Sequence, residues 1–125
     1  MTATDDLHAY AATEFGYLTT TGRVTGKAHE IEIWFALNPD PTSRIVYMMA
    51  GERERTDWVR NLRHDPAVAI RIADSTWPAT AQIIAPGEPD EQLARELLCG
   101  KYQGWQPGQP LSDWGRTALP VRFTL

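Results

Sequence analysis

The sequence has little of what a disulfide, metal or nucleic-acid protein needs. Cys99 is the only cysteine, so an intramolecular disulfide and a zinc site built on thiolates are excluded. The three histidines, His8, His29 and His64, stand in separate segments without ligand spacing, so we expect no metal site. The net charge of −4 provides no basic field for DNA or RNA, which argues against a nucleic-acid partner.

Long hydrophobic runs are also absent. The segment IWFAL stops after five residues, whereas a membrane-spanning helix needs about 20 apolar residues. The first ten residues, MTATDDLHAY, are acidic and lack the apolar stretch of a secretory signal. We therefore expect no integral membrane segment and a cytoplasmic location.

The remaining composition is typical of one globular domain that spans residues 1–125. Hydrophobic residues make up 42% and charged residues 22%, which is enough to build a buried core. The first 16 residues predict a helix, mainly over 4–15, because Thr4 can cap it and Leu7, Ala11 and Phe15 recur every four residues.

The rest of the chain, residues 17–125, predicts a small barrel. Alternating apolar and β-branched residues predict six strands, over 17–21, 29–37, 44–50, 67–73, 76–84 and 119–125. Two more helices are expected, one capped by Thr56 and ending before Pro66, the other over 89–102. Pro78 places the start of the fifth strand at an edge or a bulge. Because no βαβ alternation occurs, we expect an α+β, mainly β domain with a mostly antiparallel sheet and about three helices.

The turn in TTTGRVTGKAH, residues 19–29, combines glycines with basic and hydroxyl side chains. Gly22 and Gly26 let a ligand approach the main chain, whose N–H groups can surround an anion. Side-chain donors for an anion come from Arg23, Thr25, Lys27 and His29. Two interpretations stay open at this point: a cradle for a phosphate or carboxylate, or a hairpin loop whose basic residues face water.

Three blocks of sequence together resemble a known family. They are LTTTGRVTGKAHEIEIWF, DWVRNLRHDPAVAIRI and KYQGW followed by LSDWGRTALPV. In order and spacing they are similar to the deazaflavin-dependent nitroreductase and quinone reductase family, whose members resemble the split β-barrel of pyridoxamine phosphate oxidases. The resemblance implies a six-stranded split β-barrel and an oxidoreductase that transfers a hydride from reduced coenzyme F420 to a quinone, nitro compound or enone.

The resemblance also implies a cofactor site. It places the phosphate and acidic tail of F420 at the basic turn, and the deazaflavin ring beside the following strand and the loop after the third strand. Val24 and His29 stand where that family often has lysine and arginine. The predicted cofactor-binding residues are Arg23, Thr25, Gly26, Lys27, His29, Ile31, Glu32, Ile33, Met49, Ala50, Gly51, Trp58 and Asn61. For Trp58 core packing is the stronger interpretation.

Three large aromatics near the C-terminus, Tyr102, Trp105 and Trp114, lie in a Gly/Pro/Gln-rich loop and can form one wall of a pocket around a planar ligand. The resemblance implies that Tyr102 and Trp105 close over the substrate, and Trp34 is a third pocket aromatic. Burial of these rings against the barrel is the structural alternative. No catalytic residue is certain, because the cofactor carries the chemistry; Tyr102 is the best candidate for a donor beside the acceptor.

Other functions remain open from the sequence. An FMN- or haem-binding split barrel and a non-enzymatic carrier of a lipid or other small apolar molecule suit the same fold. Glu30 and Glu32 share one strand face, but polar-outward alternation explains them better than a glycosidase pair. Exposed edge strands also predict a homodimer.

Overall fold

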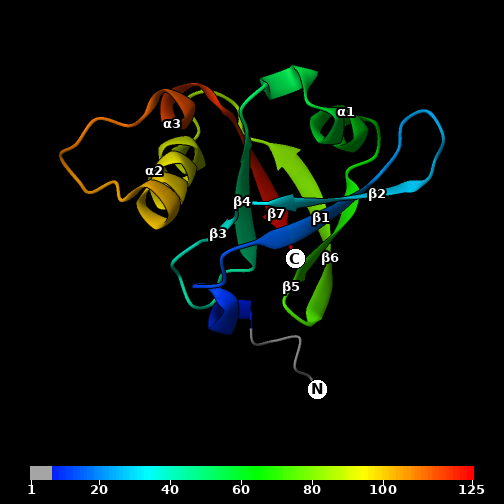
Figure 1. The fold of residues 1–125 in the computed structure, drawn as a ribbon, viewed down its shortest axis with the longest axis horizontal. Helices are drawn as coiled ribbons and strands as arrows, with labels where there is room; N and C mark the ends of the chain where they lie inside the picture. Colours follow the sequence, from blue (N-terminus) through cyan, green and yellow to red (C-terminus); the bar gives the residue numbers. More distant parts are fainter. Residues whose placement is uncertain (1–6) are drawn as a thin grey trace.

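The computed structural model describes residues 7–125, whose strands form one curled antiparallel sheet (Figure 1). The seven strands have the order β2-β1-β5-β6-β7-β4-β3. Their bounds are β1 Gly16–Thr21, β2 Ala28–Ile33, β3 Ala36–Leu37, β4 Ile45–Ala50, β5 Ala67–Ile72, β6 Ser75–Ile83 and β7 Leu119–Thr124. The predicted antiparallel split barrel is confirmed, with seven strands in place of six.

Three α-helices and two short 3-10 helices complete the described chain. They are η2 Leu7–Tyr10, η3 Arg53–Arg55, α1 Asp57–His64, α2 Pro89–Gln103 and α3 Asp113–Thr117. In Figure 1, α2 and α3 lie side by side next to β3 and β4, while α1 lies at the other end, against β1. No helix within residues 7–125 is long and apolar enough for a membrane crossing.

The extra strand arises because the predicted strand 29–37 breaks at Trp34 and Phe35. The Phe35 N–H donates to the Tyr102 hydroxyl (3.0 Å), and the Phe35 carbonyl accepts from Lys101 Nζ (3.0 Å). Side chains of α2 therefore provide hydrogen-bond partners for the main-chain groups of Phe35, which a neighbouring strand would provide if the strand were continuous. The chain bends there, and the remaining two residues pair with β4 as β3.

The predicted N-terminal helix is wrong over residues 7–15, and its first residues, 4–6, lie outside the described chain. Only Leu7–Tyr10 are helical, in a 3-10 turn. Separate contacts hold this segment: Leu7 is fully buried, and His8 Nε2 donates to the Ser43 carbonyl (2.9 Å). Contacts of individual residues therefore hold this segment without a continuous apolar helix face.

The structure contradicts one smaller prediction and confirms another. Thr56 precedes α1 but makes no capping hydrogen bond, and its buried Oγ1 has no partner. The strand with Pro78 lies inside the sheet, but β7 pairs with it only from Thr80 to Ile83. Pro78 therefore has a strand neighbour on one side alone, which confirms the predicted edge position at the start of this strand.

The core has two parts, separated by β4. Val46 and Met48 point into the barrel, where they pack with Trp58 and Leu62 of α1. The alternate residues Tyr47 and Met49 point outward against α2 and α3. This two-sided burial explains why β4 reads as an unbroken apolar run.

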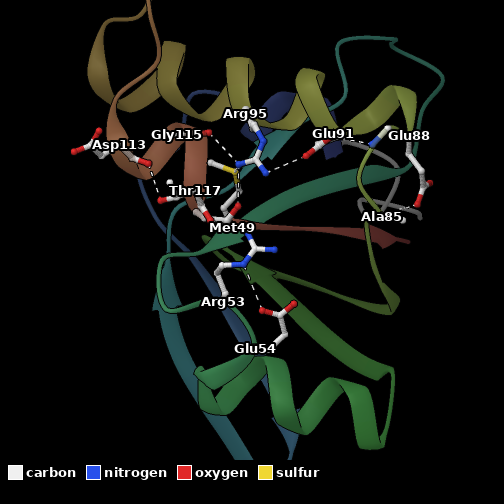
Figure 2. A network of polar contacts seen from close by, with 12 residues as sticks. Met49, Arg53, Glu54, Ala85, Glu88, Glu91, Arg95, Asp113, Gly115 and Thr117 are labelled. Carbon is white, nitrogen blue, oxygen red and sulfur yellow. Dashed lines mark hydrogen bonds and ion pairs between the residues drawn. The ribbon is translucent and has the colours of Figure 1, made fainter.

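A buried arginine joins α2 to α3. Arg95 is 7% exposed, and its Nη1 donates to the carbonyls of Gly115 (3.0 Å) and Ala118 (2.8 Å). Its Nη2 pairs with Glu91 at 3.2 Å (Figure 2), and the Gly87 N–H together with this ion pair lowers the pKa of Glu91. The packing is close, since a Cβ on Gly115 would lie 2.5 Å from the Cys99 sulfur. These contacts fix the position of α3.

Candidate functional site

The hairpin between β1 and β2 forms a first pocket with α1, of about 220 Å³, which we call the hairpin pocket. Its lining residues are Gly22, Arg23, Val24, Thr25, His29, Asp57 and Asn61. The turn is closed by hydrogen bonds from the Gly22 N–H to the Lys27 carbonyl (2.7 Å) and from the Gly26 N–H to the Gly22 carbonyl (2.8 Å). Gly26 has a positive φ of 74°, which favours glycine.

Asn61 of α1 fixes the basic turn to the barrel. Its Oδ1 accepts from the Arg23 guanidinium (2.8 Å) and from the Arg23 main-chain N–H (3.2 Å), and its Nδ2 donates to Thr20 Oγ1 (3.1 Å). Asn61 is buried with all these groups satisfied. The second guanidinium nitrogen pairs at 3.3 Å with Asp57, whose side chain is 85% exposed. Such an exposed ion pair is weak, so Arg23 can exchange it for another anion.

The hairpin pocket fits an anionic group. A Cβ on Gly22 would lie 2.6 Å from His29 Nε2, so the glycine leaves the space that the imidazole occupies. The pocket therefore combines a guanidinium, an imidazole and the Thr25 hydroxyl on one short turn. Asp57 is the one lining residue with a negative charge. These donors suit a phosphate or carboxylate.

A second pocket, of about 410 Å³, lies where β2 ends; we call it the aromatic pocket. Its lining residues are Phe15, Glu32, Ile33, Trp34, Met49, Gln103 and Trp114. The Trp34 and Trp114 rings meet edge to face, 5.4 Å apart and at 86°. Gly51 lies beneath Trp114, where a Cβ would come within 3.3 Å of the indole. Two indoles and a thioether form walls suited to a flat, largely apolar molecule.

Glu32 is the only ionisable side chain among the described residues that line the aromatic pocket. Its carboxylate accepts from the Tyr17 hydroxyl at 2.9 Å, and this bond together with the negative charge raises the pKa of Tyr17. The Arg71 guanidinium lies 4.1 Å from the centre of the Tyr17 ring and pairs with Glu30 at 3.4 Å. Glu32 is thus held by a row of side chains across β1, β2 and β5.

Tyr102 and Trp105 do not line the aromatic pocket. The Tyr102 hydroxyl lies 2.8 Å from the Glu14 carbonyl, 3.0 Å from the Phe35 carbonyl and 3.0 Å from the Phe35 N–H. Its ring stacks behind Trp34, 4.5 Å away and 3° from parallel. Trp105 lies in a separate hollow of about 440 Å³, where its indole N–H donates to the Gln109 carbonyl (2.8 Å). In this arrangement the Tyr102 hydroxyl is committed to the main chain.

The other predicted residues lie near the pockets without lining either. Gly26 and Lys27 belong to the hairpin turn, Ile31 packs against the barrel core, and Ala50 is buried. Trp58 is a core residue, 9% exposed. The structure also brings to the pockets Phe15, Asp57 and Gln103, which were not predicted from the sequence, and Trp114, one of the predicted loop aromatics. Asp57 and Gln103 resemble ordinary helix-end residues, so no local pattern distinguishes them.

One strand connects the two pockets. His29 lines the hairpin pocket and Ile33 lines the aromatic pocket, four positions apart on the same face of β2. At the usual rise of an extended strand this is roughly 13 Å. The arrangement fits an elongated ligand with an anionic end in the hairpin pocket and a flat ring at the other.

The curled antiparallel sheet with α2 and α3 on its outer side defines a split β-barrel, and solved structures agree. A conserved hypothetical protein from Mycobacterium tuberculosis is 19% identical, over 98% of this chain and 79% of that chain, with a TM-score of 0.71. An F420-H2 dependent reductase is 20% identical, over 89% and 93%, with a TM-score of 0.64. A protein from Listeria innocua, provisionally named a pyridoxamine 5'-phosphate oxidase, is 14% identical over 98% of this chain and 93% of that chain, with a TM-score of 0.67.

The family is shown by sequence. The model of the F420H(2)-dependent quinone reductase family matches residues 8–123, and the chain belongs to this family. No curated protein matches the sequence. The protein is therefore an oxidoreductase whose cofactor is coenzyme F420, which decides against the FMN, haem and carrier alternatives.

Proposed function

We propose that the protein reduces a flat quinone held in the aromatic pocket, with nitro compounds and enones as further acceptors of the same kind. The observation that carries the proposal is the pocket with two indole walls at the end of β2, on the same strand as the hairpin pocket. When bound, reduced F420 supplies the hydride. A cytoplasmic location and a homodimer remain predictions.

The residues have separate roles in this proposal. Arg23, Thr25 and His29 hold the acidic tail of the cofactor, and Asn61 keeps the Arg23 guanidinium in place. The main chain of 31–33 and 49–51 supports the ring. The two indole walls of the aromatic pocket hold the flat acceptor.

A quinone also takes up a proton when it accepts a hydride. The Tyr102 hydroxyl is bonded to main-chain groups, so it is poorly placed to donate this proton. The Glu32 carboxylate accepts a hydrogen bond from Tyr17 and has no proton to donate, so water at the mouth of the aromatic pocket is the proton source.

The test is anaerobic mixing of the protein with reduced F420 and menadione, a flat naphthoquinone, followed by absorbance of the oxidised deazaflavin. We expect steady turnover in the wild type, and a KM for menadione about tenfold higher in Trp34→Leu, because one wall of the pocket is lost. Trp105→Leu is the matched variant outside the pocket. If Trp105→Leu raises the KM more than Trp34→Leu, the acceptor lies in the Trp105 hollow, and no turnover in the wild type rejects the function.

Removal of the Asp57 charge should strengthen cofactor binding. Its carboxylate competes with the cofactor for Arg23, so Asp57→Asn should tighten F420 binding by about threefold to tenfold at low salt. A fluorescence titration at low and at high salt measures the effect, which should shrink as salt rises. Asp65→Asn, at the end of the same helix, is the control with the same change in net charge. Weaker binding in Asp57→Asn would show that Asp57 holds Arg23 in its binding position instead.

A further inference from the structure

Lys101 is a half-buried lysine near the end of α2 that neither pocket uses. Its Nζ lies 3.7 Å from the centre of the Phe35 ring and 5.0 Å from that of Tyr102, and it donates to the Phe35 carbonyl at 3.0 Å. It has no ion-pair partner within residues 7–125. An ammonium without a carboxylate loses hydration free energy on burial, and here burial lowers its pKa to about 8.

Lys101 and Tyr102 hold the same peptide. The Phe35 carbonyl is within hydrogen-bond distance of both side chains, and the Phe35 N–H donates to the Tyr102 hydroxyl. This peptide marks the bend between β2 and β3, where no strand pairing fixes the main chain. The last turn of α2 therefore holds the unpaired segment that follows β2 and contains Trp34.

The contacts continue from this bend into the aromatic pocket. The Tyr102 ring, beside the Lys101 ammonium, stacks on Trp34 at 4.5 Å. Trp34 in turn meets Trp114, and both indoles line the pocket. Trp34 directly precedes the Phe35 residue that Lys101 holds, so the cation acts on Trp34 through its neighbour in the chain and through the ring behind it.

We propose that Lys101 is a positioning residue for the acceptor: it holds the Phe35 peptide and the Tyr102 ring, and these fix the plane of Trp34 in the aromatic pocket. The inference rests on the proposed acceptor site. A cation suits this role because it binds the carbonyl and the faces of two aromatic rings at once. Besides Lys101, the titratable groups of the cluster are Tyr102, whose pKa burial raises, and Glu14, whose charge raises it further.

The charge of Lys101 predicts how the KM for the acceptor depends on pH. Below about pH 8 the ammonium is charged and all its contacts are made; above this value the charge and its attraction to the rings are lost. The KM for menadione should therefore rise above about pH 8 in the wild type. In Lys101→Met this rise should be absent, since methionine has no charge to lose.

The variants are Lys101→Met, which keeps the length of the side chain, and Lys101→Arg, which keeps the charge and the donor. Gln92→Met, on an exposed position of α2, is the control. At about pH 7 we expect a KM for menadione roughly fivefold to tenfold higher in Lys101→Met, with kcat and the KM for reduced F420 within about twofold of wild type. Lys101→Arg should restore most of the loss.

A second readout does not depend on activity. The indole N–H resonance of Trp34, assigned with Trp34→Phe, should shift in the wild type as pH passes about 8 and should stay constant in Lys101→Met. A wild-type resonance that does not move overturns the inference even if Lys101→Met fails to fold. A quinone KM equal to wild type in a folded Lys101→Met also overturns it. A wild type that neither binds nor reduces menadione rejects the proposed function itself.

Discussion

Arg23→Glu should weaken F420 binding by about a hundredfold, or about 2.7 kcal/mol of binding free energy. The wild-type guanidinium lines the hairpin pocket and is fixed there by Asn61 at 2.8 Å. Glutamate removes the strongest anion donor and places a second carboxylate beside Asp57, so the acidic tail meets repulsion. Titration of the deazaflavin fluorescence measures the change.

The control for this variant is Arg63→Glu, an exposed charge reversal at the end of α1. We expect less than about a threefold change for it at moderate salt, because screening removes most of a distant charge effect. Arg23→Gln should lie between wild type and Arg23→Glu. Equal losses in the two glutamate variants would mean that net charge, and not the pocket, controls the affinity. Wild-type affinity in Arg23→Glu would place the tail elsewhere.

The second large effect concerns stability. Arg95→Met should lower the free energy of unfolding by about 2–3 kcal/mol. The arginine is 7% exposed, and its loss leaves the carbonyls of Gly115 and Ala118 and the Glu91 carboxylate without their donor. Methionine replaces most of the volume, so the loss reports the polar contacts. Urea unfolding followed by far-UV circular dichroism measures it.

Arg116→Met is the matched control for Arg95→Met. Arg116 pairs with Asp113 on the exposed side of α3, so its removal should change stability by less than about 0.5 kcal/mol. Equal destabilisation by both variants would contradict the role given to the buried network. Because Trp114 belongs to α3, Arg95→Met should also change the near-UV circular dichroism of the folded protein.

The strands and α2 could be predicted from the sequence because their signals are local. Alternation of apolar residues marks β5 and β7, aromatic and β-branched residues mark β1, and an unbroken apolar run marks β4. The absence of βαβ alternation indicates an antiparallel sheet. The break at Phe35 has no local signal, since its partners Lys101 and Tyr102 lie more than 60 positions further along the chain. Arg95 likewise reads as a solvent-facing residue until the fold brings the end of α3 against it.

The two pockets likewise differ in how far the sequence alone could predict them. The basic turn could be predicted because its glycines, hydroxyl and basic side chains lie within eleven consecutive residues. Its residues Arg23, Thr25 and His29 do line the hairpin pocket. The aromatic pocket draws on β2, β4, α2, α3 and the segment before β1, so residue order could not reveal its members. Met49 was predicted from the family resemblance and Trp34 from its place on the strand face of Glu30 and Glu32, whereas no local pattern marks Phe15 or Gln103.

The strand that joins the pockets lies at the border of the sheet and has only β1 as a partner among the described residues. The N–H and C=O groups on the edge of β2 that faces away from β1 therefore form no hydrogen bonds with another strand in the described part of the chain. A molecule laid along β2 can bind these groups directly, and such bonds do not depend on which side chains the strand carries. Because only main-chain groups take part, the side chains of residues 28–33 can be substituted during evolution without loss of this binding, provided that the strand stays extended.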